Sequence, residues 1–231
     1  MNWKDEIINN IEWNGAISNI EQKEKIGDKI CKRVKNGEVI GFGSGSTSFV
    51  ATKAIAKRIK EENLNITAIP TSHEINMLCT SLGIPTASLN QAKPDWCFDG
   101  ADEVDPHGWL IKGRGAAMFK EKLIMKSCEE RYILVDSSKF VNTLCDKFPI
   151  PIECHPESLC YVKNELIKLG AKSCVLRLAK GKDGPVITEN GNFILDAVFE
   201  NIDETFEQKL SNIVGVLETG LFIGYNVIVE K

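Results

Sequence analysis

Length, composition and charge exclude several classes of protein. The chain has 231 residues, 43% of them hydrophobic, which is enough for one large domain or two modest ones with a buried core. A formal net charge of -4 offers no basic footprint for a nucleic-acid backbone, so we expect no nucleic-acid partner. Residues 1–10 contain no apolar run long enough for a signal peptide or a membrane span, so we expect no membrane partner.

The eight cysteines indicate a reducing compartment. They are scattered, include no Cys-x-x-Cys pair, and occur in a chain too large to need a disulfide framework, so we expect a cytoplasmic protein. Cys154, His155 and Cys160 come nearest to a metal cluster, but a tetrahedral zinc site needs a fourth close ligand. We interpret them as buried thiols beside a surface imidazole and expect no metal.

A helix, a strand and a second helix are predicted near the start of the chain. Ser18 and Glu21 match a capping box, and apolar residues then recur at helical spacing until Gly37. A short apolar strand follows at 39–42, and a second helix begins after Thr47. Strand, glycine turn and helix form one α/β unit.

The same alternation continues and decides the fold class. The further predicted elements are a strand at 66–69, a helix at 72–82, a strand at 96–98, a helix after Gly115 and a strand at 132–135. Such alternation predicts an α/β fold with a doubly wound, mostly parallel, Rossmann-like sheet and helices on both faces.

A second, smaller α+β domain of ferredoxin-like type is expected where prolines interrupt this periodicity. Residues 148–151, Phe-Pro-Ile-Pro, break the pattern, and the segments after them resemble a strand, a helix and paired strands. Asn190-Gly191 between two apolar runs predicts a tight hairpin. We therefore expect a Rossmann-like catalytic domain of residues 1–145 plus 206–231 and a small domain of residues 146–205.

An anion-binding turn is predicted between the first strand and the helix after it. Ser44-Gly45-Ser46-Thr47 lies where backbone N–H groups and the positive end of a helix dipole favour a phosphate group. A dinucleotide fingerprint needs glycine at Ser46, and a Walker loop needs Gly-Lys at Ser46-Thr47, so neither motif is present. The other interpretation is that Ser46 or Thr47 only caps the helix over a glycine turn.

Clustered carboxylates follow the strand at 96–98. Asp99 and Asp102, with Glu103 and Asp105, are expected at the carboxyl edge of the sheet, where open α/β folds bind their ligands. Their spacing does not match a calcium loop, and no nearby histidine completes a transition-metal site. A solvated acidic turn is the alternative interpretation.

A third segment combines a cationic turn with a helical carboxylate. Lys112-Gly113-Arg114-Gly115 precedes a helix that is expected to carry Glu121 and Lys122 about two turns in. Lysine and glutamate could then face a common cleft, although a surface Glu–Lys pair is the ordinary explanation for Glu121 and Lys122. Histidines lie outside these motifs or at their margins, so a serine hydrolase triad is poorly supported.

Together these motifs resemble, in order, those of the ribose-5-phosphate isomerase type A family. The matching segments are Gly43 to Thr47, Ile69-Pro70-Thr71-Ser72, Asp99-Gly100-Ala101-Asp102-Glu103, Lys112-Gly113-Arg114-Gly115, Glu121-Lys122, Ser138-Lys139, Phe148 to Pro151 and Gly220-Leu221-Phe222. They run nearly end to end. The departures are Arg114, where the family often has glycine, and Lys120, where arginine is frequent.

The resemblance implies a reaction and residues for it. The reaction interconverts D-ribose 5-phosphate and D-ribulose 5-phosphate through an enediolate, in the non-oxidative pentose phosphate pathway, with no cofactor and in a homodimer or homotetramer. Glu121 would move the proton and Lys112 would stabilise the enediolate, with Asp99 and Asp102 contacting the sugar. The implied substrate-binding residues are Ser44, Gly45, Ser46, Thr47, Gly100, Ala101, Gly113, Arg114, Gly115 and Lys139.

Two other classes of protein share part of this pattern. Sugar-phosphate-responsive transcription regulators have a similar domain, but the segment before Gly41 holds one predicted helix and no basic recognition element. A nucleotide-dependent dehydrogenase is disfavoured by the glycine pattern. Lys112 and Glu121 together favour the isomerase.

Overall fold

The computed structural model describes residues 11–231, so the prediction for residues 1–10 lies outside it. The helices are α2 (Ile20–Cys31), α3 (Ser46–Glu62), α4 (His73–Leu82), α5 (Met118–Ser127), α6 (Leu159–Lys168) and α7 (Phe206–Ser211). The strands are β1 (Val39–Phe42), β2 (Thr67–Pro70), β3 (Trp96–Asp99), β4 (Glu103–Val104), β5 (Leu110–Ile111), β6 (Glu130–Leu134), β7 (Ile150–Cys154), β8 (Ser173–Leu176), β9 (Phe193–Val198), β10 (Val216–Thr219), β11 (Leu221–Phe222) and β12 (Ile228–Glu230). Within residues 11–231, no helix combines the length and the apolar character needed to span a membrane.

Two compact units divide the chain. Unit 1 comprises residues up to Gly100 with Leu123–Ser138 and Val227–Lys231, and unit 2 comprises Ala101–Lys122 and Lys139–Asn226. Packing units need not coincide with domains that fold on their own, so the predicted domain boundaries stay a prediction.

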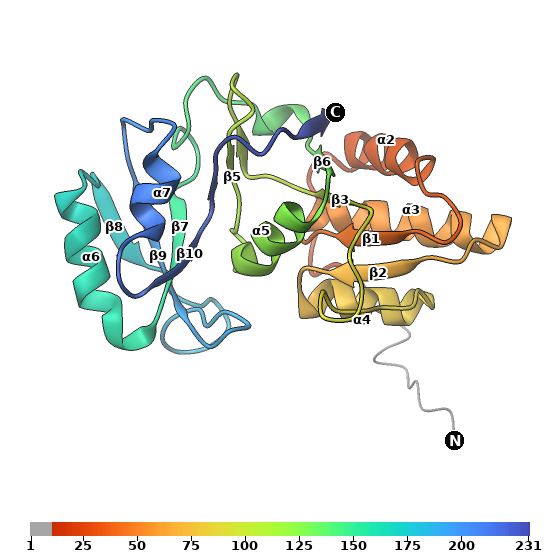
Figure 1. Cartoon of the computed structure of the whole chain (residues 1–231), viewed down its shortest axis with the longest axis horizontal. Coiled ribbons are helices and arrows are strands. Elements are labelled where there is room, and N and C mark those ends of the chain that lie inside the picture. The colour runs from red at the N-terminus through yellow and green to blue at the C-terminus, as the bar shows by residue number, and fades with distance from the viewer. Residues whose placement is uncertain (1–10) are drawn as a thin grey trace. The chain divides into compact units, whose positions relative to one another are not determined.

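Unit 1 is built on a parallel sheet in the strand order β12-β6-β3-β1-β2. Ile40, Phe42 and Phe98 belong to a core that also contains apolar side chains of α2, α3 and α4. Figure 1 shows these three helices beside β1, β2 and β3. Ile124 of α5 packs at Gly41, on the face opposite to Ile40 and Phe42. Helices therefore cover both faces, which confirms the predicted doubly wound fold.

The start of α2 differs from the prediction. The residue before the helix is Asn19, whose left-handed backbone makes no side-chain cap, so the expected capping box of Ser18 and Glu21 is wrong. The Ser18 hydroxyl instead accepts a hydrogen bond from Lys23 Nζ at 3.4 Å. In contrast, α4 starts only one residue later than predicted, at His73, because the Ser72 hydroxyl caps it by accepting from Ile75 N, and it ends at Leu82 as predicted, with Gly83 left-handed.

Unit 2 contains an antiparallel sheet in the order β10-β7-β9-β8. The side chains of Ile152 and Leu195, opposite each other on β7 and β9, pack with apolar side chains of α6 and α7 in a separate core. Figure 1 shows α6 and α7 beside the strands of this sheet. A three-stranded sheet, β11-β5-β4, completes this unit and leads into the segment that contains Lys112. The predicted small α+β region is therefore present.

The predicted hairpin around Asn190-Gly191 is only partly formed. The turn exists, because Thr188 N donates to Asn192 O at 2.9 Å. The segment before it is not a strand and has only an isolated bridge between Leu178 and Pro185. The strand after the turn, β9, pairs with β7 and β8 instead, since these longer apolar strands offer a full ladder of hydrogen bonds.

Candidate functional site

The predicted site residues fall into both units. Unit 1 holds Ser44, Gly45, Ser46, Thr47, Asp99 and Gly100. Unit 2 holds Ala101, Asp102, Lys112, Gly113, Arg114, Gly115, Glu121 and Lys139.

The anion turn of unit 1 leads from β1 into α3. The residue before the helix is Gly45, at φ 88, and it makes no side-chain cap, so the interpretation of Ser46 or Thr47 as the cap is wrong. A positive φ of this size is accessible to glycine and strained for a side-chain-bearing residue. The uncapped N–H groups of the first helical turn can therefore serve an anion.

A buried lysine that sequence reasoning missed lies beside this turn. Lys23 of α2 is 2% exposed, and its ammonium donates to the Ser46 hydroxyl at 3.0 Å. It also lies 3.7 Å from Asp136 Oδ2. The available signal was its position on the apolar stripe of α2 between Ile20 and Ile26, where a lysine needs a polar partner.

Asp136, at the carboxyl end of β6, is held in its charged form. Burial would raise the pKa of Asp136, but hydrogen bonds from the Ser138 hydroxyl and backbone and from Asn19, with the charge of Lys23, outweigh it, so its pKa lies below the ordinary value. A carboxylate therefore fixes the Lys23 ammonium beside Ser46.

Asp99 organises the loop next to the anion turn. Its side chain is buried, and Oδ1 accepts from Ser44 N at 3.1 Å and from Gly100 N at 2.8 Å. The Ser44 hydroxyl in turn shares a 2.6 Å hydrogen bond with Thr71. The two predicted motifs at Ser44 and Asp99 are thus brought together within unit 1.

The central feature of unit 2 is a buried ion pair. Lys112 Nζ lies 3.2 Å from Glu121 Oε2, and the two side chains are 3% and 5% exposed. Glu121 occupies the first turn of α5, not the second as predicted, because the helix starts only at Met118. The helix dipole favours a carboxylate in that turn. A base and a cation therefore share one buried position.

Lys122 is also buried, so the alternative of a surface Glu121–Lys122 pair is wrong. Its ammonium bonds to Glu218 Oε1 at 2.7 Å and to Glu207 Oε1 at 2.9 Å. It also donates to Leu221 O at 3.0 Å. These three contacts come from β10, α7 and β11, and they anchor the first turn of α5 in unit 2.

The Lys112 backbone is fixed by a close approach that only glycine permits. Lys112 N donates to Gly220 O at 2.8 Å. A Cβ on Gly220 would lie 2.1 Å from Lys112 O, far inside contact distance. This explains why Gly220 stands in the motif before Leu221-Phe222.

Asp102 bonds to the turn that follows Lys112. Its Oδ2 accepts from Arg114 N at 3.1 Å, and its Oδ1 lies 3.7 Å from Arg114 Nε. The Arg114 side chain is 66% exposed, so this pair is largely solvated. The two predicted motifs that contain Asp102 and Gly113–Gly115 are thus brought together within unit 2.

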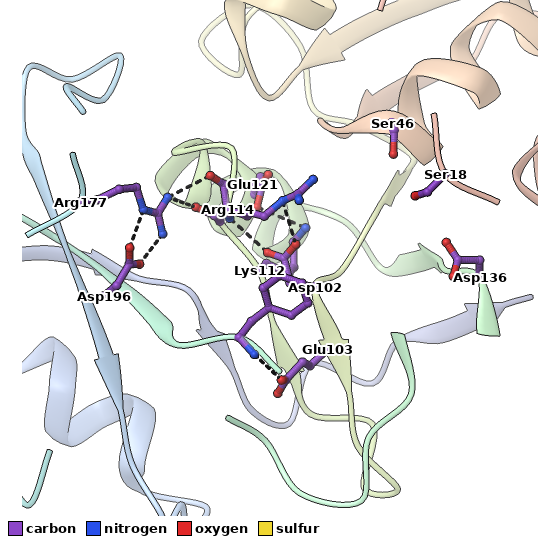
Figure 2. Close-up of polar contacts among 12 residues, drawn as sticks. Ser18, Ser46, Asp102, Glu103, Lys112, Arg114, Glu121, Asp136, Arg177 and Asp196 are labelled. Carbon is purple, nitrogen blue, oxygen red and sulfur yellow. Dashed lines mark hydrogen bonds and ion pairs between the residues drawn. The ribbon is translucent and has the colours of Figure 1, made fainter. Parts of the chain in front are cut away.

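Sequence reasoning missed the ion pair between Arg177 and Asp196 in unit 2. Arg177, directly after β8, binds Asp196 of β9 with two hydrogen bonds and also donates to the Gly113 and Arg114 carbonyls (Figure 2). No motif surrounds Arg177, and only the paired register of β8 and β9 brings it beside Asp196.

The remaining predicted residues have less specific surroundings. Lys139 is partly exposed, and its ammonium lies 5.1 Å from the centre of the Phe148 ring. Its predicted role in binding phosphate stays a prediction, as do the roles of Gly100 and Ala101.

The Cys154–Cys160 segment does not assemble a cluster. Cys154 is buried, and burial raises the pKa of its thiol to about 11, which disfavours the thiolate that metals bind. Cys160 is exposed, so its interpretation as a buried thiol is wrong. His155 Nδ1 accepts from Glu157 N at 3.3 Å. Among residues 11–231, no three His, Cys, Asp or Glu side chains are grouped to hold a metal ion.

Comparison with known proteins gives one consistent family. Residues 67–230 match the family described as ribose 5-phosphate isomerase A (phosphoriboisomerase A). The ribose-5-phosphate isomerase A of Methanocaldococcus jannaschii is 43% identical over 209 residues, which cover 89% of this chain and 92% of that protein.

Solved structures agree. The ribose 5-phosphate isomerase A of Methanocaldococcus jannaschii aligns with a TM-score of 0.89 at 40% identity, over 93% of this chain and 96% of its own. A D-ribose-5-phosphate isomerase solved in complex with phospho-erythronic acid aligns with a TM-score of 0.88 at 41% identity, over 92% and 95% of the two chains. With matches of this extent and identity, the chain belongs to the ribose 5-phosphate isomerase A family.

Proposed function

We propose that this chain interconverts D-ribose 5-phosphate and D-ribulose 5-phosphate, with Glu121 as the base that moves the proton. The observation that carries the proposal is the buried Lys112–Glu121 pair at 3.2 Å, in a member of the isomerase family. An aldose–ketose isomerisation needs one base and one group that stabilises a negative oxygen, and this pair supplies both.

The proton transfer assigns distinct tasks to the two residues. The Glu121 carboxylate takes the proton from C2 of the open-chain aldose and returns it to C1, while the hydroxyl proton of O2 passes to O1, which gives the ketose. The enediolate formed between these steps carries negative charge on oxygen, and the Lys112 ammonium stabilises it. Both side chains are almost fully buried, and charge stabilisation is stronger there than in water.

Phosphate recognition is assigned to the turn Ser44–Thr47, with Lys139 as a cationic partner. Support comes from the uncapped start of α3 and from the Lys23 ammonium bonded to Ser46. Backbone N–H groups and a buried cation together favour a small, doubly charged group.

Sugar recognition is assigned to Asp99 and Asp102, which contact hydroxyl groups and assist ring opening. The substrate-binding set is completed by Gly100, Ala101, Gly113, Arg114 and Gly115. Asp102 already bonds to the Arg114 backbone, so this carboxylate is oriented before substrate arrives.

Location and assembly form part of the same proposal. We propose a cytoplasmic homodimer or homotetramer, as the family resemblance implies. All eight cysteines are free thiols, which suits a reducing compartment. Light scattering of the purified chain measures the assembly.

Turnover by chelator-treated protein tests the proposed function. We expect ketose to form from ribose 5-phosphate, and much less from ribose, which lacks the phosphate group. Glu121→Gln protein serves as the control for a contaminating isomerase. If the wild-type protein forms no ketose even at high concentration, the chain binds sugar phosphates without converting them.

A further inference from the structure

Arg177 is held rigidly at the end of β8. Its Nε donates to Asp196 Oδ2 at 2.8 Å, and its Nη2 donates to Asp196 Oδ1. Arg177 N also donates to Ile194 O at 2.9 Å, which continues the β8–β9 ladder by one residue. The two side chains are 14% and 21% exposed. A forked, largely buried pair of this kind fixes the plane of the guanidinium group.

The remaining edge of the guanidinium faces the Gly113–Gly115 turn. Arg177 Nη1 donates to Gly113 O at 3.0 Å and to Arg114 O at 2.9 Å. Figure 2 shows the guanidinium with Asp196 on one side and the turn of Arg114 on the other. Two consecutive carbonyl groups of the turn are therefore drawn to one cation.

This contact also orients the N–H groups of the turn. The C=O and N–H of a trans peptide point in opposite directions, and no described peptide bond is cis. The N–H groups of Arg114 and Gly115 therefore point away from the guanidinium. The Arg114 N–H donates to Asp102 Oδ2 at 3.1 Å. The peptide between Gly113 and Arg114 is therefore held at its carbonyl by Arg177 and at its N–H by Asp102.

Closure of the turn does not produce this orientation by itself. Ala116 N donates to Gly113 O at 3.0 Å, which closes the turn but leaves the Arg114 carbonyl unconstrained. The same peptide carries the Gly115 N–H. Arg177 is the group that holds this second carbonyl.

We propose that Arg177, fixed by Asp196, is a positioning residue that aims the Gly115 N–H and, through the Arg114 N–H, the Asp102 carboxylate at the sugar. This inference rests on the proposed function. The Gly115 N–H presents positive partial charge to the oxygen that becomes negative in the enediolate, while the Arg114 N–H orients the Asp102 carboxylate. Their placement matters more to the reaction than to capture of the phosphate group.

The test compares Arg177→Gln and Arg177→Lys with Lys180→Gln. Lys180 is exposed and lines the same cavity of about 510 Å³ as Arg177, so its variant removes a nearby positive charge while Arg177 keeps its bonds to the turn. For each protein, kcat and KM for ribose 5-phosphate are measured, with inhibition by inorganic phosphate and by phospho-erythronic acid. The carboxylate of that acid resembles the enediolate, whereas inorganic phosphate reports only on the anion turn.

We expect Arg177→Gln to lower kcat about 10- to 100-fold, because a small misplacement of aligned groups has effects of that size. Affinity for phospho-erythronic acid should fall with it, while inhibition by inorganic phosphate stays unchanged. Arg177→Lys should also lose activity, because an ammonium cannot hold Asp196 and two carbonyls with a planar fork. Lys180→Gln should stay within about twofold of wild type.

Three results would overturn the proposal. The first is a wild-type kcat in Arg177→Gln. The second is full activity in Arg177→Lys, which would mean that the charge alone matters. The third is a loss of affinity for inorganic phosphate in Arg177→Gln as large as its loss for phospho-erythronic acid, which would indicate general damage. If Arg177→Gln fails to fold, as judged by thermal melting, Arg177→Lys and Asp196→Asn carry the test.

The binding measurement separates this proposal from the proposed function. A wild-type protein that binds phospho-erythronic acid but forms no ketose contradicts the isomerase, and the Arg177 variants still report on the turn. A wild-type protein that forms ketose at the same kcat as Arg177→Gln contradicts only the role of Arg177.

Discussion

The anion turn of unit 1 and the Lys112–Glu121 segment of unit 2 recognise charge in different ways. The anion turn is local: Gly45 and its neighbours offer backbone N–H groups and hydroxyls, and the buried Lys23 ammonium bonds to Ser46. The Lys112–Glu121 segment depends on side chains from distant parts of the chain, including Arg177 and residues of α7 and β10.

This difference predicts unequal sensitivity to substitution. Backbone donors survive most side-chain changes, so the anion turn should be damaged chiefly where its backbone conformation is altered. When one partner of a buried ion pair is removed, the other charge stays buried without compensation. Single side-chain changes should therefore affect catalysis in unit 2 far more than binding in unit 1.

The largest effect is expected for Lys112→Met. Loss of the cation that stabilises the enediolate oxygen should lower kcat by about 10²- to 10³-fold, as loss of a single oxyanion donor does. It also leaves the buried Glu121 carboxylate without this ammonium, which should lower the free energy of unfolding by about 3–5 kcal/mol.

Steady-state kinetics and urea unfolding measure the two effects of Lys112→Met separately. Lys126→Met, an exposed change on the same helix, is the matched control. Should the methionine variant not fold, Lys112→Arg keeps the charge and tests the geometry. A folded methionine variant with a kcat close to wild type would show that another group stabilises the intermediate.

A smaller effect, on binding, is expected for Gly45→Val. Gly45 has φ 88, and the space that a Cβ would occupy there is open, so the damage should come from the backbone conformation and from bulk beside the anion. Affinity for inorganic phosphate should fall by about tenfold or more, which corresponds to about 1.4 kcal/mol. Calorimetry measures the affinity.

Gly37→Val provides a matched control for this change. Gly37 has φ 86 and equally open surroundings, but it lies outside the anion turn. Both variants should lose a similar amount of stability, about 1–3 kcal/mol, because both strain a left-handed backbone. Equal phosphate affinity in the two variants would remove the turn from the site.

The smallest effect is on stability and depends on pH. The lowered pKa of Asp136 means that its carboxylate stabilises the fold above the unfolded-state pKa of about 3.9, and that this contribution is lost as pH falls through the lower pKa of the folded state. Asp136→Asn should therefore be less stable than wild type by about 2 kcal/mol at pH 7, with a smaller difference at pH 3. Urea unfolding at both pH values measures this, and an equal difference at both would contradict the assignment.

The anion turn of unit 1 and the strand before it could be predicted from sequence. The strand at 39–42 and the turn at Ser44–Thr47 depend on neighbours in the chain, so apolar spacing and glycines are enough to locate them. The capping box at Ser18 is also a local signal, but it failed because the Ser18 hydroxyl bonds to Lys23 instead. A tertiary contact can therefore override a local sequence pattern even near the anion turn of unit 1.

The contacts around Lys112 and Glu121 in unit 2 could not be predicted in the same way. The sequence suggests that Lys112 and Glu121 face a common cleft, but no spacing reveals the contacts around them: Lys112 N donates to Gly220 O, and Lys122, next to Glu121, bonds to residues of α7 and β10. Arg177 and Asp196 meet only because β8 and β9 pair in one register. Burial also decided against the surface interpretation of Glu121 and Lys122, since helical spacing does not fix which face is covered.

The most direct test of the central claim is the transfer of solvent deuterium by wild type and by Glu121→Gln. The wild-type protein in heavy water should place deuterium at C1 of ribulose 5-phosphate and, through the reverse reaction, at C2 of ribose 5-phosphate, since a carboxylate base exchanges its proton with solvent. Folded Glu121→Gln should do so at least about 10²-fold more slowly, as expected for loss of a general base. Incorporation by the variant at the wild-type rate would contradict the account and transfer the role of base to Asp99 or Asp102.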